Sequence, residues 1–171
     1  MAKEAKPEPD YVNTFPDILA PYVPTPPDVV ERILELANTG GDDFVVDLGC
    51  GDGRVLITAA SRFGARGLGV DVAGYWVAES EANAQKAEVA HLTTFRLQDA
   101  ATVDLSEATV ITLYLVQWST DKLKTQIQSQ AKSGTRIVSH SFPITDWVPT
   151  KSEAFIDSAG TERKIYLWVM D

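Results

Sequence analysis

A glycine-rich turn inside the stretch VVDLGCGDGRVLITAA, residues 45–60, contains the residues best suited to hold a ligand. Gly49, Gly51 and Gly53 follow a short apolar run that predicts a buried strand, and glycine lets a backbone bend sharply and approach a ligand closely. The helix predicted after the turn would point its first N–H groups at the same place, which favours a carboxylate or a phosphate. The pattern therefore predicts a site for a ligand that carries a nucleotide or a nucleoside.

The spacing within the turn bears on which ligand this is. The glycines form a G-x-G-x-G pattern, whereas the dinucleotide fingerprint has its third glycine one residue later, where this chain has Arg54. Asp47 lies two residues before the first glycine and could pair with the ammonium group of an amino-acid ligand, which a pyrophosphate lacks. The alternative is a structural cap of the turn. Cys50 is interpreted as a small residue that fills the turn, and we do not expect it to act as a nucleophile.

Two further carboxylates follow the next predicted strands. Asp71 ends the second strand, where a carboxylate accepts hydrogen bonds from ribose hydroxyls. Asp99 follows the third strand, within plausible reach of an adenine amino group. Each could instead be an ordinary loop acid. A ligand with a ribose, an adenine and an amino-acid end but no phosphate is S-adenosylmethionine, and the sequence predicts that cofactor.

The elements that must position these residues alternate between strands and helices. Strands are predicted at 44–48, 67–72, 93–97, 109–115 and 136–141, of which 44–48 and 109–115 are apolar runs, and helical patterns cover 55–63, 78–89 and 121–131. Such alternation predicts an α/β fold with a doubly wound, mostly parallel sheet. Segments 152–156 and 164–170 then follow with only a turn at Gly160 between them, which predicts a C-terminal antiparallel hairpin and a Rossmann-like sheet of seven strands.

The N-terminal segment differs in composition from the remainder. Residues 1–27 carry seven of the nine prolines, and we expect them to form an extended arm ahead of a single domain at 28–171. Thr25 is predicted to cap the first helix of the domain, with prolines in its first turn and Asp28 three residues on.

Composition limits the partners and the compartment. The formal net charge of −9 disfavours nucleic acid as a partner and favours basic ones, although acidic charge also simply keeps proteins soluble. The single cysteine, a polar N-terminus and the lack of a long apolar run predict a cytoplasmic protein without membrane insertion. Clustered cysteines and histidines with metal-ligand spacing are missing, so no metal is expected.

Several segments resemble a known family. VVDLGCGDGR resembles the first motif of class I S-adenosylmethionine-dependent methyltransferases. PYVPTPPDVVERIL, DLSEATVITLYL and SGTRIVSHSFPITDWVP resemble a small family of protein-lysine N-methyltransferases, which includes compact archaeal enzymes and mitochondrial enzymes that modify bioenergetic proteins. The resemblance runs from about Pro21 to the C-terminus. It implies a seven-stranded fold with a C-terminal hairpin, with S-adenosylhomocysteine as the product.

The resemblance also implies roles for individual residues. The backbone of residues 49–53 would hold the methionine end, Asp71 with Val72 the ribose, and Asp99 with Ala100 the adenine. The arm, with Tyr22 and Thr25, would fold over the cofactor. Residues 113–118, with Leu115 also at the cofactor, and residues 140–147 would line the acceptor entrance. The segment YLVQWS within the first of these does not match a lysine site that we can identify.

Aromatic and titratable residues near that entrance are candidates for the transfer itself. Tyr114 and Trp118 could wall a desolvated channel and attract the departing charge through their ring faces, or could simply pack in the core. His140 and Asp146 could act as a base or orient the acceptor. For His140 the alternative is a hydrogen-bonded structural histidine.

Three functions fit the sequence. The first is methylation of accessible lysines in proteins, and the second is methylation of a small molecule on the same fold. The third is a dinucleotide-binding oxidoreductase or a nucleotide sensor, against which Arg54, Asp47 and the terminal hairpin count.

Overall fold

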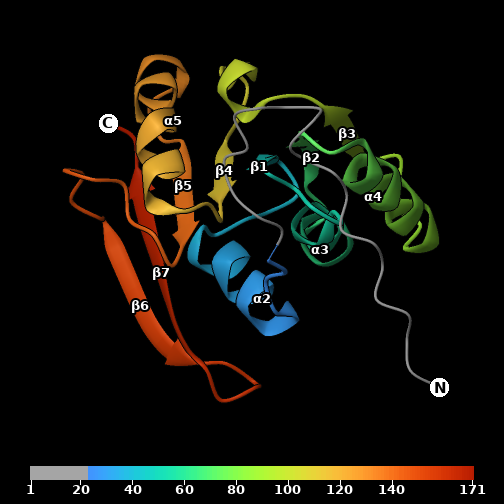
Figure 1. The fold of residues 1–171 in the computed structure, drawn as a ribbon, viewed down its shortest axis with the longest axis horizontal. Helices are drawn as coiled ribbons and strands as arrows, with labels where there is room; N and C mark the ends of the chain where they lie inside the picture. Colours follow the sequence, from blue (N-terminus) through green and yellow to red (C-terminus); the bar gives the residue numbers. More distant parts are fainter. Residues whose placement is uncertain (1–22) are drawn as a thin grey trace.

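The computed structural model describes residues 23–171, so Tyr22 and most of the predicted arm lie outside the described residues (Figure 1). Seven strands form one sheet in the order β3-β2-β1-β4-β5-β7-β6. Their bounds are β1 Phe44–Leu48, β2 Arg66–Asp71, β3 Thr93–Leu97, β4 Val110–Leu113, β5 Arg136–His140, β6 Lys151–Ile156 and β7 Glu162–Val169. The first five are parallel, and β7 runs antiparallel to both β5 and β6. The predicted doubly wound sheet with its terminal hairpin is confirmed.

Helices cover both faces of this sheet. α2 (Pro27–Leu36), α3 (Arg54–Phe63) and α4 (Gly74–Lys86) contribute to one cluster of buried side chains. α5 (Gln117–Gln130) and the short 3₁₀ helix η1 (Ala100–Thr102) contribute to the other. Within residues 23–171, no helix combines the length and the apolar character needed to cross a membrane.

Three helix starts differ from their predictions, and one of them is that of α4, which begins at Gly74, four residues before the predicted start at 78. Pro26 is the N-cap of α2 and no side chain caps the helix, so the predicted Thr25 cap is wrong. With Pro27 at the first position, one N–H that would otherwise need a cap is already missing. α5 begins at Gln117, four residues before its predicted start, which places Trp118 on its first turn instead of after a strand. The residues Gln-Trp-Ser-Thr carry no apolar period, and contacts to another loop, described below, hold this turn.

The strand register brings the ends of three strands together. Leu48 of β1 is opposite Val70 of β2 on one side and Leu113 of β4 on the other. The glycine turn that follows β1 therefore lies between Asp71 and Tyr114. This is the carboxyl edge of the sheet, where open α/β folds bind their ligands.

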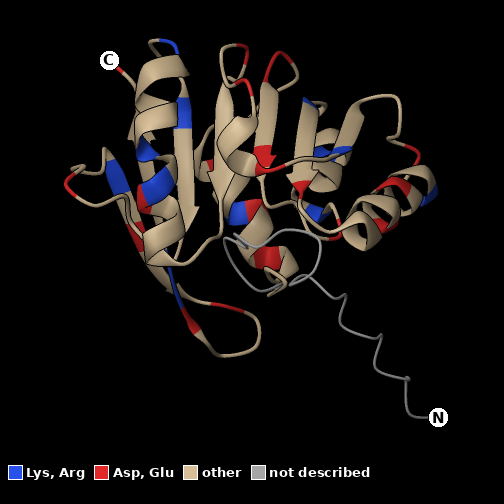
Figure 2. Ribbon diagram, turned by 45° about the horizontal axis from the view of Figure 1, so that its top comes forward, with Lys and Arg blue, Asp and Glu red and all other residues tan. Residues whose placement is uncertain are grey.

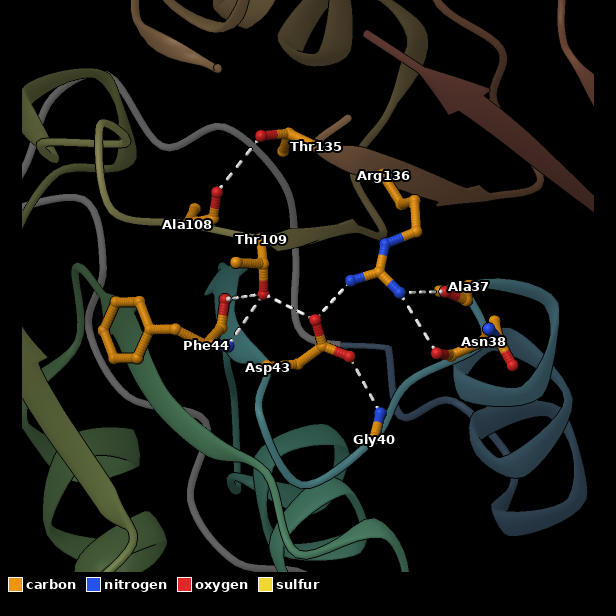
Figure 3. A network of polar contacts seen from close by, with 9 residues as sticks. All are labelled: Ala37, Asn38, Gly40, Asp43, Phe44, Ala108, Thr109, Thr135 and Arg136. Atoms are coloured by element: carbon orange, nitrogen blue, oxygen red, sulfur yellow. Dashed lines mark hydrogen bonds and ion pairs between the residues drawn. The ribbon is translucent and has the colours of Figure 1, made fainter. Parts of the chain in front are cut away.

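A polar cluster ties the opposite, amino edge of the sheet together (Figure 3). The guanidinium of Arg136 pairs with Asp43 and donates to the carbonyls of Ala37 and Asn38 at 2.8 and 3.1 Å. Asp43 also accepts from Thr109 Oγ1 and from the Gly40 amide, both at 2.8 Å. Burial alone would raise the pKa of Asp43, but these donors outweigh it and leave that pKa lowered. The cluster thereby fastens the end of α2 to the starts of β1, β4 and β5.

Lys and Arg positions are dispersed along the fold. In the view of Figure 2 they are scattered over the ribbon among Asp and Glu positions.

Candidate active site

A cleft of about 640 Å³ opens at the carboxyl edge of the sheet. It brings together nine of the residues predicted from the sequence: Thr25, Asp47, Gly49, Cys50, Gly51, Asp71, Val72, Tyr114 and Leu115. Asp52, within the predicted backbone segment 49–53, also lines it. Five further lining residues, which sequence reasoning did not assign to the site, are Val23, Pro24, Arg54, Val55 and Trp76.

The glycine turn has the conformation that its sequence predicts. Gly49, Gly51 and Gly53 have φ values of 89°, 53° and 84°, in the left-handed region that other residues rarely adopt. Gly49 and Cys50 both donate their amides to the Val70 carbonyl, at 3.0 and 2.8 Å. A Cβ on Gly53 would lie 3.0 Å from Phe95 and Ser80, so this glycine serves packing and does not line the cleft.

Asp71 holds the turn from the neighbouring strand. Its Oδ2 accepts from the Gly51 amide and its Oδ1 from the Ala73 amide, each at 3.0 Å. Burial raises the pKa of Asp71, although these amides act to lower it. A carboxylate oxygen can accept two hydrogen bonds, so each oxygen of Asp71 can also accept one from a ribose hydroxyl.

Asp47 is a buried carboxylate whose hydrogen-bonding capacity is only partly used. Its side chain accepts from Thr112 Oγ1 at 2.7 Å, and the residue is 5% exposed. Burial, with repulsion from Asp71 and Asp52, raises the pKa of Asp47 to about 7. A cation beside it would restore the ionised form, and the ammonium of an amino-acid ligand is such a cation.

Helix α4 supports the turn with polar side chains that the sequence did not reveal. Ser80 Oγ donates to the Gly51 carbonyl at 2.7 Å, and Asn83 Nδ2 donates to the Asp52 carbonyl at 3.0 Å. Trp76, one turn earlier, lines the cleft. Trp76, Ser80 and Asn83 are four and three residues apart, which places them on one side of the helix. From sequence alone such a spacing indicates packing against the protein, not contact with a ligand-binding turn.

Arg54 connects the turn to the segment before α2. Its guanidinium pairs with both oxygens of Asp52, at 3.0 and 2.6 Å, and donates to the Thr25 carbonyl at 2.7 Å. Thr25 thus lines the cleft and is fixed there by the first residue of α3.

The predicted adenine end lies at an adjoining cleft of about 350 Å³. Ala100 lines it together with Gln98, which sequence reasoning missed, and with Asp71, Val72 and Leu115. Asp99 does not line either cleft; its side chain accepts from the Ala101 amide at 2.9 Å and caps η1.

Tyr114 and His140 form a stacked pair at the acceptor side. Their ring centroids are 4.0 Å apart with a tilt of 30°, and Tyr114 lines the cleft while His140 is fully buried behind it. Neither imidazole nitrogen has a hydrogen-bond partner within residues 23–171, contrary to the hydrogen-bonded alternative for His140. Burial, together with nearby Arg163, lowers the pKa of His140 to about 4, so the ring is neutral near pH 7.

Trp118 and Asp146 are exposed, and neither lines the clefts. Trp118 is 57% exposed and does not line the cleft. Asp146 is exposed and its carboxylate lies 3.8 Å from Lys124 Nζ. Their roles in transfer stay predictions.

The charged groups that line the main cleft favour a cationic ligand. Asp47, Asp52 and Asp71 stand against the guanidinium of Arg54. The donor set thus fits the ammonium and sulfonium of S-adenosylmethionine. Among the described residues, no group of His, Cys, Asp and Glu is arranged to hold a metal ion.

Relatives of known function carry the same domain. Residues 47–151 match the family described as the ANTKMT methyltransferase domain. A protein-lysine N-methyltransferase of Saccharolobus islandicus is 40% identical over 151 residues, which are 88% of this chain and 93% of the relative. The adenine nucleotide translocase lysine N-methyltransferase of Mus musculus is 28% identical over 88% of this chain and 62% of its own length.

A solved structure is similar over most of its length. It is described as an RNA methyltransferase from Salinibacter ruber in complex with S-adenosyl-L-homocysteine, with 42% identity and a TM-score of 0.81. The similarity covers 86% of this chain and 94% of that one. These matches leave no support for the dinucleotide-binding alternative. The chain belongs to the ANTKMT methyltransferase-domain family and is an S-adenosylmethionine-dependent methyltransferase.

Proposed function

We propose that this enzyme transfers the methyl group to lysine side chains of proteins. The observation that carries the proposal is the match to a protein-lysine N-methyltransferase that is 40% identical over 88% of this chain. The acidic lining of the cleft also repels a phosphate backbone. Relatives from Saccharolobus islandicus and Mus musculus are named as lysine methyltransferases, which supports the same acceptor.

The cofactor is assigned to the residues that fit each of its parts. Asp47 would bind the ammonium, the backbone of residues 49–53 the rest of the methionine end, and Asp71 with Val72 the ribose. Leu115 and Ala100 would contact the adenine, with Asp99 at its edge. When bound, the cofactor supplies a methyl carbon activated by the sulfonium.

The protein's own tasks are alignment and exclusion of water. A lysine acceptor must first lose its proton, and a desolvated channel lowers an amine's pKa enough to favour that loss. Tyr114 would wall the channel with its ring face and stabilise the positive charge that passes from sulfur to nitrogen. His140 has its nitrogens turned into the core and is assigned no proton transfer; it would support the ring of Tyr114 from behind.

A second acceptor class has a specific observation in its favour. The similar structure from Salinibacter ruber is described as an RNA methyltransferase. The net charge of −9 and the acidic cleft lining count against RNA for this chain. A small molecule is the third acceptor class, and the experiment below distinguishes it from protein and RNA. The proposal includes a cytoplasmic location, supported by the single cysteine.

The test is methyl transfer from S-adenosylmethionine with a labelled methyl group into an extract of the protein's own cells, divided into protein, RNA and small-solute fractions. We expect label in protein, resistant to ribonuclease and recovered as methyllysine after hydrolysis. Asp71→Ala should abolish the label, whereas Asp104→Ala, a change at an exposed acid away from the cleft, should preserve it. Label confined to RNA or to small solutes would refute the lysine acceptor.

A further inference from the structure

The start of α5 is fastened to the loop after β5. Gln117 Nε2 donates to the Pro143 carbonyl at 2.7 Å and lies 3.1 Å from Thr145 Oγ1 and from Asp121 Oδ1. The Gln117 side chain therefore bridges two segments that are more than twenty residues apart in sequence. This explains the unfamiliar Gln in YLVQWS as a structural residue and not as part of the chemistry.

Asp121 completes the same cluster one turn later. Its Oδ1 accepts from the Thr145 amide at 3.0 Å and its Oδ2 from Thr145 Oγ1 at 2.8 Å. The Thr145 amide is the main reason why the pKa of Asp121 is lowered, so the carboxylate is ionised near neutral pH. Lys124 Nζ adds a bond to the Thr145 carbonyl at 2.8 Å. Gln117, Asp121 and Thr145, the clamp, thus hold the first turn of α5 and residues 143–145 as one wall.

The clamp presents Trp118 to solvent. Trp118 is three residues after Leu115, which lines the cleft. Trp118 is nevertheless 57% exposed, and it lies on the helix turn that the clamp fixes. An exposed tryptophan held in a defined position has little conformational entropy to lose when a partner covers it.

Other exposed apolar side chains surround the same edge. Seven large hydrophobic side chains are exposed within residues 23–171, and four of them are in segments at the carboxyl edge of the sheet: Val23, Tyr75, Leu97 and Trp118. Val23 lines the cleft, Tyr75 is on the first turn of α4, and Leu97 ends β3. A small acceptor that entered the cleft would leave these side chains in water, whereas a protein acceptor would cover them.

We propose that Trp118, fixed by the Gln117–Asp121–Thr145 clamp, is a specificity-determining residue that packs against an apolar side chain of the acceptor protein next to its methylated lysine. The inference rests on the proposed function and adds the chemistry around the lysine. Trp118 binds the acceptor outside the cleft, and Tyr114 faces the reacting amine within it. Asp121 is a positioning residue that acts through Trp118.

The test measures initial methylation rates against the concentration of the protein fraction of the extract, with labelled S-adenosylmethionine saturating. Trp118→Ala should raise the half-saturating protein concentration about tenfold, as expected for loss of an interface tryptophan, and leave the plateau rate and S-adenosylhomocysteine affinity unchanged. Ile156→Ala removes an equally exposed side chain from the outermost strand and should change nothing. Asp121→Ala should act like Trp118→Ala, while Asp121→Asn, which can keep both bonds to Thr145, should restore the wild-type value.

Any other result contradicts either the role of Trp118 or the proposed lysine acceptor. Unchanged half-saturation in Trp118→Ala, or an equal effect of Ile156→Ala, overturns the inference while protein labelling by the wild type still upholds the lysine acceptor. A lower plateau with unchanged half-saturation places Trp118 in the chemical step and also overturns it. Failure of the wild type to label any protein refutes the proposed function, and the inference with it.

Discussion

At the scale of single residues, the site contains two buried polar side chains that the fold leaves incompletely satisfied. Asp47 accepts one hydrogen bond from Thr112 and has its pKa raised to about 7, and His140 has both nitrogens without a partner within residues 23–171. Unsatisfied buried polar groups lower stability, and they are concentrated where function requires them. Asp47 fits this pattern because its missing partner is the ammonium of the cofactor.

Replacing Asp47 by asparagine should therefore stabilise the free protein and weaken cofactor binding. The asparagine would still accept from Thr112 while removing a charge that burial disfavours, so we expect a gain on the order of 2 kcal/mol in the free energy of unfolding at pH 8. At pH 3, below the ordinary pKa of 3.8, Asp47 is neutral in both the folded and the unfolded protein, and the gain should vanish. Urea unfolding at both pH values and calorimetric titration with S-adenosylhomocysteine measure the two effects. Undiminished affinity would show that Asp47 does not bind the ligand.

Sequence reasoning found the residues whose types are unusual for their positions. Glycines with positive φ and carboxylates at strand ends stand out, and the structure brings Gly49, Asp47 and Asp71 into one cleft. Ser80 and Asn83 could not be found in this way, since small polar residues on a helix are common and their target is a backbone carbonyl. Only the packing of α4 on the turn reveals them.

At the scale of elements, the segment before α2 is joined to the cofactor turn through Arg54. The guanidinium donates to the Thr25 carbonyl and is held in place by Asp52. Because residues 23–25 line the cleft, we expect this connection to keep them in contact with a bound ligand.

Arg54→Ala should loosen that closure. We expect affinity for S-adenosylhomocysteine to fall about tenfold, as for the loss of a charge-assisted hydrogen bond. Arg62→Ala is the matched control, because Arg62 is also in α3 and pairs with Glu31 on the surface. Titration calorimetry on the two variants gives the comparison. Equal affinities would mean that Thr25 stays in place without Arg54.

Among the strands, β1 and β3 have the predicted bounds. At β1 the reason is an apolar run that stops at Gly49. The start of α5 was misplaced, since Gln117 is helical through bonds to Pro143 and Thr145, which no local pattern contains. The same error put Trp118 in a channel wall, whereas the structure presents it to solvent.

At the scale of the whole molecule, the two buried groups make stability depend on pH in opposite directions. Asp47 takes up a proton on folding between its ordinary pKa of 3.8 and about 7, so its contribution falls as pH rises through that range. His140 gives up a proton on folding between its ordinary pKa of 6.5 and about 4, so its contribution rises with pH. Over their common range the two slopes oppose each other.

The wild-type protein should therefore show only a shallow change in its free energy of unfolding between about pH 4.5 and 6.5. His140→Phe, which keeps a ring beside Tyr114, should become less stable as pH rises across this range. Asp47→Asn should become more stable. Denaturant unfolding at half-unit pH steps gives the three slopes, and the same slope in all three proteins would contradict the assignment.

The polar cluster at the amino edge has a consequence for engineering. Arg136, Asp43 and Thr109 fasten the starts of β4 and β5, far from the segments that leave the other ends of these strands. We expect residues 116–118 and 141–149, which follow Leu115 of the cofactor site and the end of β5, to be exchangeable between relatives while the anchored ends of the strands keep their register. Such exchanges would keep the cofactor-binding turn of the enzyme and change the segments that we propose to contact the acceptor.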